Sequence, residues 1–381
     1  MSTPHSEDLS SAIEVDDYYD AAVLDPTALR VKDRKKARCP VRGCSAALEE
    51  CAYNKQWRLP YCKVHAIRLH PNPESPTFVY YNGEDLESKK CAQLRNFRCE
   101  QSFVEHHVLN NPKKAETHRL GYENSEDALS WNVFVPLLEA GRLADTMQWF
   151  LSGHPSSVTQ EPQLYLWGAQ VDIQANRFDF FELLDDARKI FEPKKEVRRF
   201  PTEPDIMLIT DRMIMCIEAK FTSGNPLALE METAGAGDKP KSRAGLIARY
   251  ADRWPESTRY FQRGALDRAP LHSQLLRNMI FASWMAEKEK KDWHVVNLVS
   301  ATQWGKRSSR RPAGYDFTDP TPAVREYLNS EYQDHFTCCT WEGLYQHVIR
   351  RQPEIELLSA YLKGKTAHLE RAFDLADEVA S

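Results

Sequence analysis

The most hydrophobic part of the chain is a pair of short apolar runs near its middle. Residues 206–209 (IMLI) and 213–217 (MIMCI) are almost wholly apolar, and Thr, Asp and Arg separate them. Two such runs joined by a short polar turn are typical of strands that are buried on both faces and pair as a hairpin. The pattern therefore predicts a buried β-hairpin over residues 206–217.

Helical periodicity surrounds this hairpin. Leu129, Val133 and Leu137 recur at helical spacing behind a Ser125 start with acidic residues in the first turn, which predicts a helix from about residue 125. The other expected elements are strands over 164–168 and 294–300 and helices over 246–262, 271–288, 322–333, 341–351 and 354–379. The order helix, strand, hairpin, helix, strand indicates a mixed α/β domain.

Composition divides the 381 residues into four parts. Residues 1–37 are first acidic and then basic with little periodicity, and they are expected to form a flexible arm. Residues 38–110 are rich in Cys and His and have only short apolar runs. This part is therefore expected to be a small module that something other than hydrophobic burial holds together. The α/β core is expected over 120–302, and a helical C-terminal extension over 303–381.

The chain is mildly acidic and contains no membrane-spanning pattern. Its 50 Lys and Arg against 55 Asp and Glu give a net charge of −5, so no global positive field indicates a nucleic-acid partner. No apolar run approaches the roughly 20 residues that cross a bilayer, which excludes an integral membrane protein. The N-terminal residues resemble neither a signal nor a transit peptide, and we expect a cytoplasmic protein.

In a reducing cytoplasm the nine cysteines need another explanation than disulfides. Cys39-x4-Cys44 and Cys62-x2-His65 form two close pairs that 17 residues separate. Two such pairs can supply the four soft or borderline ligands of a tetrahedral structural Zn²⁺. Cys51 and His70 are alternative ligands.

Basic and aromatic residues accompany these pairs, among them Lys35, Arg42, Trp57, Arg58 and Arg68. Since a closed zinc site with four protein ligands is structural, the module is expected to serve recognition rather than catalysis. The basic and aromatic side chains could contact phosphates or bases, and a protein partner or an ordinary solvated face are the alternatives.

Two carboxylates and a lysine are expected to converge at the end of the hairpin. Asp205 precedes the first strand, and Glu218 and Lys220 follow the second with the spacing that puts them on one face of a strand. Two carboxylates with a backbone carbonyl form half of an octahedral Mg²⁺ site. A lysine beside that metal can position a water and stabilise the charge that develops on a phosphate.

The sequence context of this group, rather than its residue types alone, is informative. The tripeptide Asp/Glu-x-Lys occurs five times in the chain. Only the copy at Glu218 ends an apolar strand, and the chain's only Pro-Asp dipeptide, which contains Asp205, begins the strand before it. Charges beside such apolar runs are costly without a partner, which favours a functional site over a solvated strand end.

With these residues the chain resembles the PD-(D/E)XK nuclease superfamily, which has the restriction-endonuclease-like fold. The resemblance covers roughly residues 120–300 and implies a mixed sheet flanked by helices. It implies that Asp205 and Glu218 bind Mg²⁺ or Mn²⁺ with help from the Ala219 carbonyl. It further implies that Lys220 assists the attacking water or the transition state.

Two helices complete the implied site. Glu126, in the first core helix, would be a further metal or water ligand, although its neighbour Asp127 could take the same place. Gln274, in the predicted helix over 271–288, would be a positioning residue, with Arg277 as a less favoured neighbour. No tyrosine follows at the spacing of exonuclease-type variants, which favours an endonuclease.

The resemblance implies a Mg²⁺-dependent DNA endonuclease with a zinc module that helps to bind its substrate. Its biological setting would be restriction or another defence against foreign DNA. DNA is the implied partner, with a second copy of the chain or other subunits of a defence system as alternatives for assembly. A catalytically silent nucleic-acid or protein-binding scaffold and an RNA-directed nuclease are the competing hypotheses.

Overall fold

The computed structural model describes 18 stretches of the chain. They are residues 24–53, 55–73, 76–98, 101–112, 114, 119–173, 178–192, 203–222, 225, 227–228, 250–262, 264, 271–301, 320–352, 355, 358, 361–362 and 365. The chain divides into two compact units. The first unit runs to Asn96 and takes in residues 121–123 and 360–367, and the second contains the remainder.

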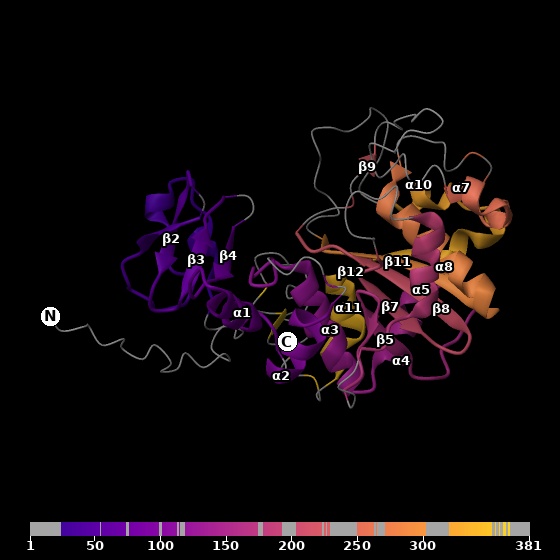
Figure 1. Ribbon diagram of the computed structural model, residues 1–381, viewed down its shortest axis with the longest axis horizontal. Helices are drawn as coiled ribbons and strands as arrows, with labels where there is room; N and C mark the ends of the chain where they lie inside the picture. The colour runs from indigo at the N-terminus through magenta and orange to yellow at the C-terminus, as the bar shows by residue number, and fades with distance from the viewer. Residues whose placement is uncertain are drawn as a thin grey trace, which may run out of the picture. The chain divides into compact units, whose positions relative to one another are not determined.

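The first unit is built on a four-stranded antiparallel sheet with the strand order β1-β2-β3-β4. Its elements are β1 (Glu49–Ala52), β2 (Arg58–Cys62), β3 (Ile67–His70), β4 (Thr77–Tyr80) and helix α1 (Leu86–Leu94) (Figure 1). The described core of this unit is a cluster of eleven buried residues that includes Cys39 and Cys62. A core this small is typical of units that a metal or disulfides stabilise.

The expectation of a flexible arm as far as residue 37 is wrong from Leu24 onward. Leu24 and Leu29 pack in the core of the first unit, and two short 3₁₀ helices follow, η2 (Pro26–Leu29) and η3 (Arg34–Lys36). Two isolated leucines in a charged stretch carry no periodicity, so only the tertiary structure shows that they are buried. Residues 1–23 lie outside the described part.

The second unit contains a six-stranded mixed sheet with the order β12-β11-β8-β7-β5-β6. Its strands are β5 (Gln163–Leu166), β6 (Ala169–Gln170), β7 (Ile206–Ile209), β8 (Met213–Ala219), β11 (Asp292–Val299) and β12 (Phe336–Thr340). The predicted hairpin is confirmed, because β7 and β8 pair antiparallel. β11 lies parallel to both β8 and β12, and the remaining pairs are antiparallel.

Helices cover both faces of this sheet. Helices α5 (Glu182–Phe191) and α8 (Ser273–Glu289) lie on one face of the sheet (Figure 1). They contribute to one buried cluster with alternate residues of the strands. The intervening residues of β7 and β8 are buried too, as expected for a sheet covered on both sides. On the other side, α3 (Glu126–Glu139) contacts β5, and α4 (Leu143–Phe150) contacts both α3 and α11 (Trp341–His347).

Shorter elements complete the described part of the second unit. They are α2 (Gln101–Val104), the π-helix η4 (Glu105–Leu109), β9 (Leu227–Ala228), α7 (Tyr250–Arg253), η5 (Pro255–Arg259), β10 (Leu271–His272), α10 (Thr321–Arg325), η7 (Ser330–His335) and η8 (Ile349–Arg351). Since α2 and η4 belong here, the first unit ends near residue 96 and not at 110 as predicted. The extension over 303–381 is not wholly helical, because β12 adds an edge strand to the sheet.

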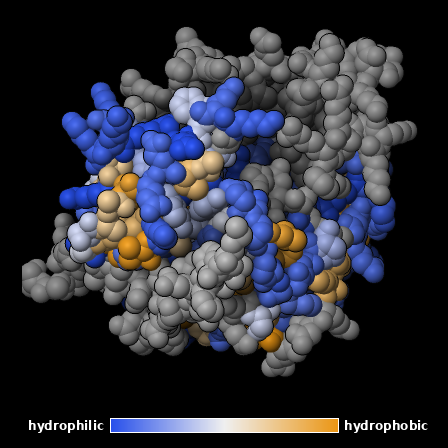
Figure 2. Space-filling view, turned by 60° about the vertical axis from the view of Figure 1, so that its left-hand side comes forward, coloured by the Kyte–Doolittle hydropathy of each residue, from blue (hydrophilic) through white to orange (hydrophobic). Residues whose placement is uncertain are grey.

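The face of the molecule drawn in Figure 2 is mainly hydrophilic where its residues are described. On the face drawn in Figure 2, hydrophobic colouring is confined to small patches among hydrophilic residues. Four of the six exposed large hydrophobic side chains in the described part belong to the first unit: Tyr53, Trp57, Val64 and Leu86. No described helix combines the length and the apolar character that a bilayer span requires.

Candidate functional site

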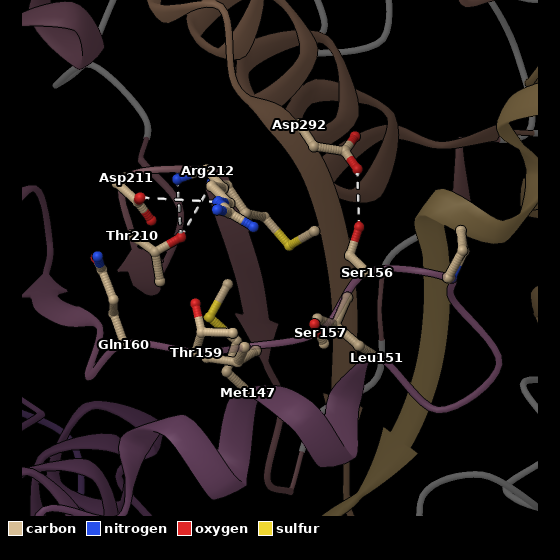
Figure 3. Close-up of a pocket in the computed structure, with 13 residues that line it drawn as sticks. Met147, Leu151, Ser156, Ser157, Thr159, Gln160, Thr210, Asp211, Arg212 and Asp292 are labelled. Carbon is tan, nitrogen blue, oxygen red and sulfur yellow. Dashed lines mark hydrogen bonds and ion pairs between the residues drawn. The ribbon is translucent and has the colours of Figure 1, made fainter.

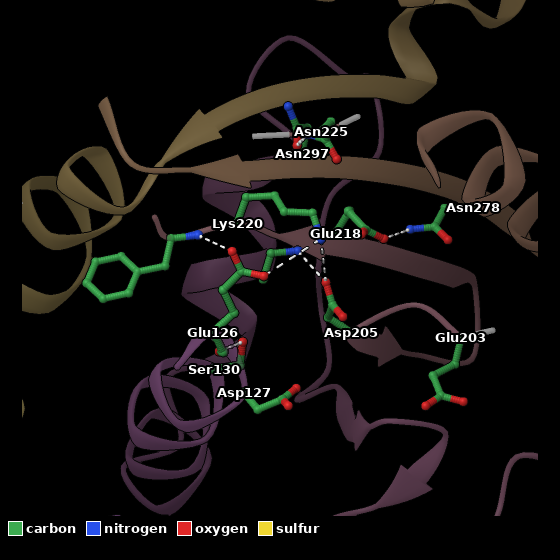
Figure 4. A network of polar contacts seen from close by, with 12 residues as sticks. Glu126, Asp127, Ser130, Glu203, Asp205, Glu218, Lys220, Asn225, Asn278 and Asn297 are labelled. Atoms are coloured by element: carbon green, nitrogen blue, oxygen red, sulfur yellow. Dashed lines mark hydrogen bonds and ion pairs between the residues drawn. The ribbon is translucent and has the colours of Figure 1, made fainter. Parts of the chain in front are cut away.

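The predicted carboxylates and lysine lie together at one end of the β7–β8 hairpin (Figure 4). The pairing of Ile206 with Ile217 continues to Asp205 and Glu218, so the hairpin register brings these two carboxylates side by side. Lys220 Nζ lies 2.7 Å from Glu218 Oε1 and 3.9 Å from Asp205 Oδ2. It also lies 3.9 Å from Oε2 of Glu126, at the start of α3. One ammonium is therefore surrounded by three carboxylates.

Backbone groups fix this arrangement. Ala219 N–H donates to Asp205 Oδ2 at 2.9 Å, and Phe221 N–H donates to Glu126 Oε1 at 3.1 Å. The Lys220 backbone is held on both sides, since its N–H donates to Leu298 O at 2.8 Å and its carbonyl accepts from Trp341 Nε1 at 2.9 Å. The charged side chains are thus placed by regular secondary structure, which limits their freedom to move.

The two acidic residues at the start of α3 have different partners. Glu126 faces Lys220, whereas Asp127 accepts from Trp167 Nε1 at 2.8 Å and lies 2.7 Å from Lys114 Nζ. Of the two residues that the sequence left open, the structure brings Glu126 to the cluster.

Helix α8 reaches Glu218 through Arg277, which the sequence ranked below Gln274, and through Asn278, to which the sequence assigned no role. Arg277 Nη2 lies 3.1 Å from Glu218 Oε2, and Asn278 Nδ2 donates to the same oxygen at 2.8 Å. Within the described part, no hydrogen bond or ion pair joins Gln274 to the carboxylates, so its positioning role stays a prediction. A buried arginine requires a carboxylate partner, and Glu218 is that partner for Arg277.

The positive charges compensate the three carboxylates unevenly. Burial alone would raise the pKa of Glu218, but Lys220 and Arg277 outweigh this effect and lower it. Burial likewise would lower the pKa of Lys220, but the surrounding carboxylates raise it. Burial and the nearby Glu218 charge raise the pKa of Asp205 to about 8. Asp205 is therefore the carboxylate that most lacks a counter-charge.

Replacing Asp205 with asparagine is expected to stabilise the protein in Mg²⁺-free buffer, and more at pH 8 than at pH 5. With its pKa near 8, the folded state keeps a proton that the unfolded carboxyl releases near pH 4. The contribution of Asp205 to stability therefore falls as the pH rises from about 4 to about 8. Since 28% of this side chain is exposed, we expect a gain of about 1–2 kcal/mol at pH 8, or about 2–6 °C in Tm.

Thermal unfolding at the two pH values measures this effect. Asp211→Asn is the matched control, because Asp211 lies in the exposed turn of the same hairpin and is expected to change little. Destabilisation by Asp205→Asn at pH 8, or an equal gain at both pH values, would show that Asp205 is not an uncompensated carboxylate.

The described geometry does not by itself define a Mg²⁺ site at the hairpin. Among the described residues, the groups with three or more donor atoms within 4.8 Å of one another lie elsewhere. Lys220 Nζ stands between the three carboxylates, at 2.7 to 3.9 Å from an oxygen of each. When Asp205 is ionised, the three carboxylates outnumber the two neighbouring cations, Lys220 and Arg277, so a further cation would balance the charge.

The four predicted zinc ligands do converge in the first unit. Cys39 Sγ and Cys62 Sγ each lie 3.5 Å from His65 Nδ1, and Cys44 Sγ lies 3.9 Å from Cys62 Sγ. With Zn–S of about 2.3 Å and Zn–N of about 2.0–2.1 Å, a tetrahedral centre separates two sulfurs by about 3.8 Å and a sulfur from a nitrogen by about 3.6 Å. The group can hold a metal ion, and its dimensions fit Zn²⁺.

The residues around this group of cysteines and histidine are compatible with a metal site. Gly43 has the φ of +76° that the turn between Cys39 and Cys44 requires. Burial, together with the neighbouring thiols, raises the pKa of Cys39, and a bound cation would favour its thiolate form. Arg95, which sequence reasoning did not select, donates from Nη2 to the His65 carbonyl at 2.8 Å.

The two alternative ligands have other contacts. Cys51 Sγ contacts the Ala52 carbonyl at 3.6 Å, and the His70 ring packs edge-on against Tyr53 with 5.2 Å between ring centroids.

A small apolar groove of about 270 Å³ lies on the first unit, between η3 and the β1–β2 connection. Its lining residues are Arg34, Tyr53, Trp57, Leu59 and His70. Trp57 is 54% exposed and Tyr53 is 45% exposed, and the Arg34 guanidinium lies 5.3 Å from the Trp57 ring centroid. The groove therefore combines exposed aromatic faces with positive charge.

Comparison with family models, with curated proteins and with solved structures finds no match for this chain. Function therefore has to be inferred from the chemistry of the sites themselves.

Proposed function

We propose that this protein is a metal-dependent nuclease of the PD-(D/E)XK type that hydrolyses phosphodiester bonds in DNA. The observation that carries the proposal is the position of Lys220, whose ammonium lies among the carboxylates of Glu218, Asp205 and Glu126 at the end of a buried hairpin. Burying several charged groups together costs folding free energy, because each charge is partly desolvated, and this favours a functional role for the cluster.

Asp205 and Glu218, with the Ala219 carbonyl, are the residues that would hold Mg²⁺ or Mn²⁺. A divalent ion there supplies charge neutralisation at the phosphate and lowers the pKa of a bound water. Lys220 donates hydrogen bonds to the attacking water or to a phosphate oxygen as negative charge develops. Arg277 and Asn278 keep Glu218 in place, and Glu126 accepts from Phe221 N–H and holds the other side of Lys220.

The first unit serves as the recognition element in this proposal, with Zn²⁺ bound by Cys39, Cys44, Cys62 and His65. In its aromatic groove a base stacks on Trp57, and the phosphates contact Arg34 and the exposed lysines of η3. Arg34 in the lining disfavours cationic ligands such as methylated lysine, which otherwise suit aromatic pockets.

The proposal is tested by incubating the protein with supercoiled plasmid, linear duplex DNA and single-stranded RNA in Mg²⁺ or Mn²⁺. We expect nicking or linearisation of the plasmid, which needs internal cleavage, and loss of this activity in Asp205→Ala. Activity that is unchanged in Asp205→Ala would remove the assigned site. Faster cleavage of RNA than of either DNA would favour the RNA-directed alternative.

A catalytically silent scaffold is the second proposal, and it is favoured because the groups of three or more close metal-donor atoms among the described residues lie away from the hairpin. Titration calorimetry with Mg²⁺ distinguishes the two, since a scaffold need not bind metal at Asp205. A role in restriction or other defence rests on the sequence resemblance alone, as does assembly with a second copy or with other subunits.

Trp57→Ala is expected to weaken binding of a short single-stranded oligonucleotide by about 5- to 150-fold, because stacking on an aromatic side chain contributes about 1–3 kcal/mol per base. Fluorescence anisotropy in Mg²⁺-free buffer measures binding without cleavage. Leu86→Ala is the matched control, since Leu86 is a large exposed side chain in the same unit but outside the groove. Equal affinities for the wild type and both variants would show that the groove does not bind nucleic acid.

A further inference from the structure

A second group of side chains that could hold a metal ion lies in the second unit, and no local sequence pattern indicates it. His154 follows α4, Asp292 begins β11, and His335 ends η7. One donor atom from each of these residues lies within 4.8 Å of the others. His335 Nε2 is 3.1 Å from Asp292 Oδ1, and His154 Nε2 is 3.9 Å from Asp292 Oδ2.

The burial of these side chains sets the group apart from a surface cluster. The side chain of His154 is 2% exposed and that of His335 is 13% exposed. Within the described part, His154 Nε2 is buried and makes no hydrogen bond, although it points toward the carboxylate of Asp292. A buried polar atom without a partner is rare in folded proteins and requires an explanation.

We propose that His154, Asp292 and His335 bind one first-row divalent cation of the zinc class. Imidazole nitrogens with a carboxylate oxygen form a ligand set that such ions prefer, and three protein ligands leave a coordination position for water. The three residues come from segments far apart in sequence, so the ion would join the end of α4, the start of β11 and η7.

A hydrogen-bond network alone explains only part of this geometry. Asp292 accepts from Ser156 Oγ at 3.2 Å (Figure 3). It also accepts from Trp293 N–H at 2.8 Å, in addition to the contact with His335. These bonds satisfy the carboxylate, but they leave His154 Nε2 without an acceptor. A cation bound by both imidazoles and the carboxylate would give His154 Nε2 a partner as well.

One hydrogen bond to His154 disfavours cation binding at Nε2. Ser156 N–H donates to His154 Nδ1 at 3.2 Å, which places the imidazole proton on Nε2. Binding a cation at Nε2 moves this proton to Nδ1, so the Ser156 amide must turn away from the ring. Cation uptake is therefore expected to shift the backbone between His154 and Ser156.

This group is separate from the carboxylate and lysine cluster of the proposed function. Asp292 pairs with Met213 at the beginning of β8, whereas Glu218 lies five residues further along that strand. At about 3.3 Å per residue, the two sites are about 17 Å apart along the sheet. The inference does not depend on the nuclease proposal, and metal content tests it without any activity measurement.

Elemental analysis of the full chain, purified without chelators, loaded with Zn²⁺ and desalted, tests the site. We expect at least two zinc ions per chain in the wild type, one in the cysteine group and one here. His335→Gln is expected to lose one equivalent, and the control His347→Gln, which alters a histidine stacked on Trp149, is expected to lose none. A single zinc ion in the wild type, or equal contents in wild type and His335→Gln, would overturn the proposal.

Cobalt substitution supplies a second measurement that does not depend on one variant. Co²⁺ bound by cysteines shows a thiolate charge-transfer band, which a site of two histidines and one aspartate lacks. In Cys62→Ser the band is expected to disappear while one equivalent of Co²⁺ stays bound, and Asp292→Asn is expected to remove that equivalent. If His335→Gln has lost its native circular dichroism, the Asp292→Asn result decides, and unchanged Co²⁺ content there would contradict the assignment.

Discussion

Lys220→Ala is expected to reduce the rate of Mg²⁺-dependent DNA cleavage by about 10²- to 10⁴-fold, the usual range for removing a positioned donor that acts on the transition state. The backbone at this position is held by hydrogen bonds to Leu298 and Trp341, so the substitution should remove the ammonium without moving the strand end. Single-turnover cleavage of a plasmid measures the change.

The same variant is expected to be less stable when Mg²⁺ is absent. Lys220 is 9% exposed and is the nearest cation to three carboxylates, and removing one partner of a buried ionic group costs about 3–5 kcal/mol. Mg²⁺ should restore part of this stability by supplying the missing charge, but it should not restore cleavage. Thermal unfolding with and without Mg²⁺ separates these two effects.

Lys189→Ala is the matched control, because Lys189 also contacts a carboxylate but is 73% exposed. It should leave both cleavage and the response to Mg²⁺ unchanged, as expected for a surface ion pair. If Lys220→Ala cleaved DNA at the wild-type rate, the role assigned to this lysine would be wrong. A loss of stability that Mg²⁺ did not reduce would separate the cluster from metal binding.

Cys62→Ser is expected to release zinc from the first unit and to unfold that unit. Zinc binding to small cysteine and histidine sites contributes about 10–16 kcal/mol, which matches or exceeds the 5–15 kcal/mol that stabilises a typical domain. The described apolar core of the unit is a cluster of eleven residues that includes Cys62 itself, so little else can replace the ion. Limited proteolysis should then cut between β1 and α1, where the wild type resists.

Cys91→Ser is the control for this prediction. Cys91 is exposed on α1 and makes only a long contact of 3.9 Å with Glu87 Oε1. This variant should keep its zinc and its resistance to protease. A Cys62→Ser protein that kept the same zinc content and proteolytic pattern as the wild type would refute the zinc assignment.

Local patterns predicted the parts of the fold that local interactions specify. The apolar runs around Thr210 and Arg212 predicted the β7–β8 hairpin, and the periodicity after Ser125 predicted α3. The four metal ligands of the first unit followed from two short spacings. Asp205, Glu218 and Lys220 could be selected because they adjoin these apolar strands.

Features that depend on distant contacts could not be predicted in this way. β12 pairs in parallel with β11 and has a half-exposed sequence without strict alternation, so its segment was expected to be part of a helical extension. Asn278 contacts a strand about 60 residues away, and the sequence offers no spacing that indicates this contact or that ranks Arg277 above Gln274. His154 lies 138 residues before Asp292, and only the folded chain brings their donor atoms together.

Anomalous diffraction from crystals soaked in Mn²⁺ tests the central proposal most directly, because it locates the ion that the chemistry requires. We predict a Mn²⁺ peak about 2.0–2.3 Å from carboxylate oxygens of Asp205 and Glu218, with Lys220 Nζ beside it. Crystals of Asp205→Asn grown and soaked in the same way should lack this peak. A wild-type crystal without Mn²⁺ density at these two carboxylates would contradict a metal-dependent site at the hairpin.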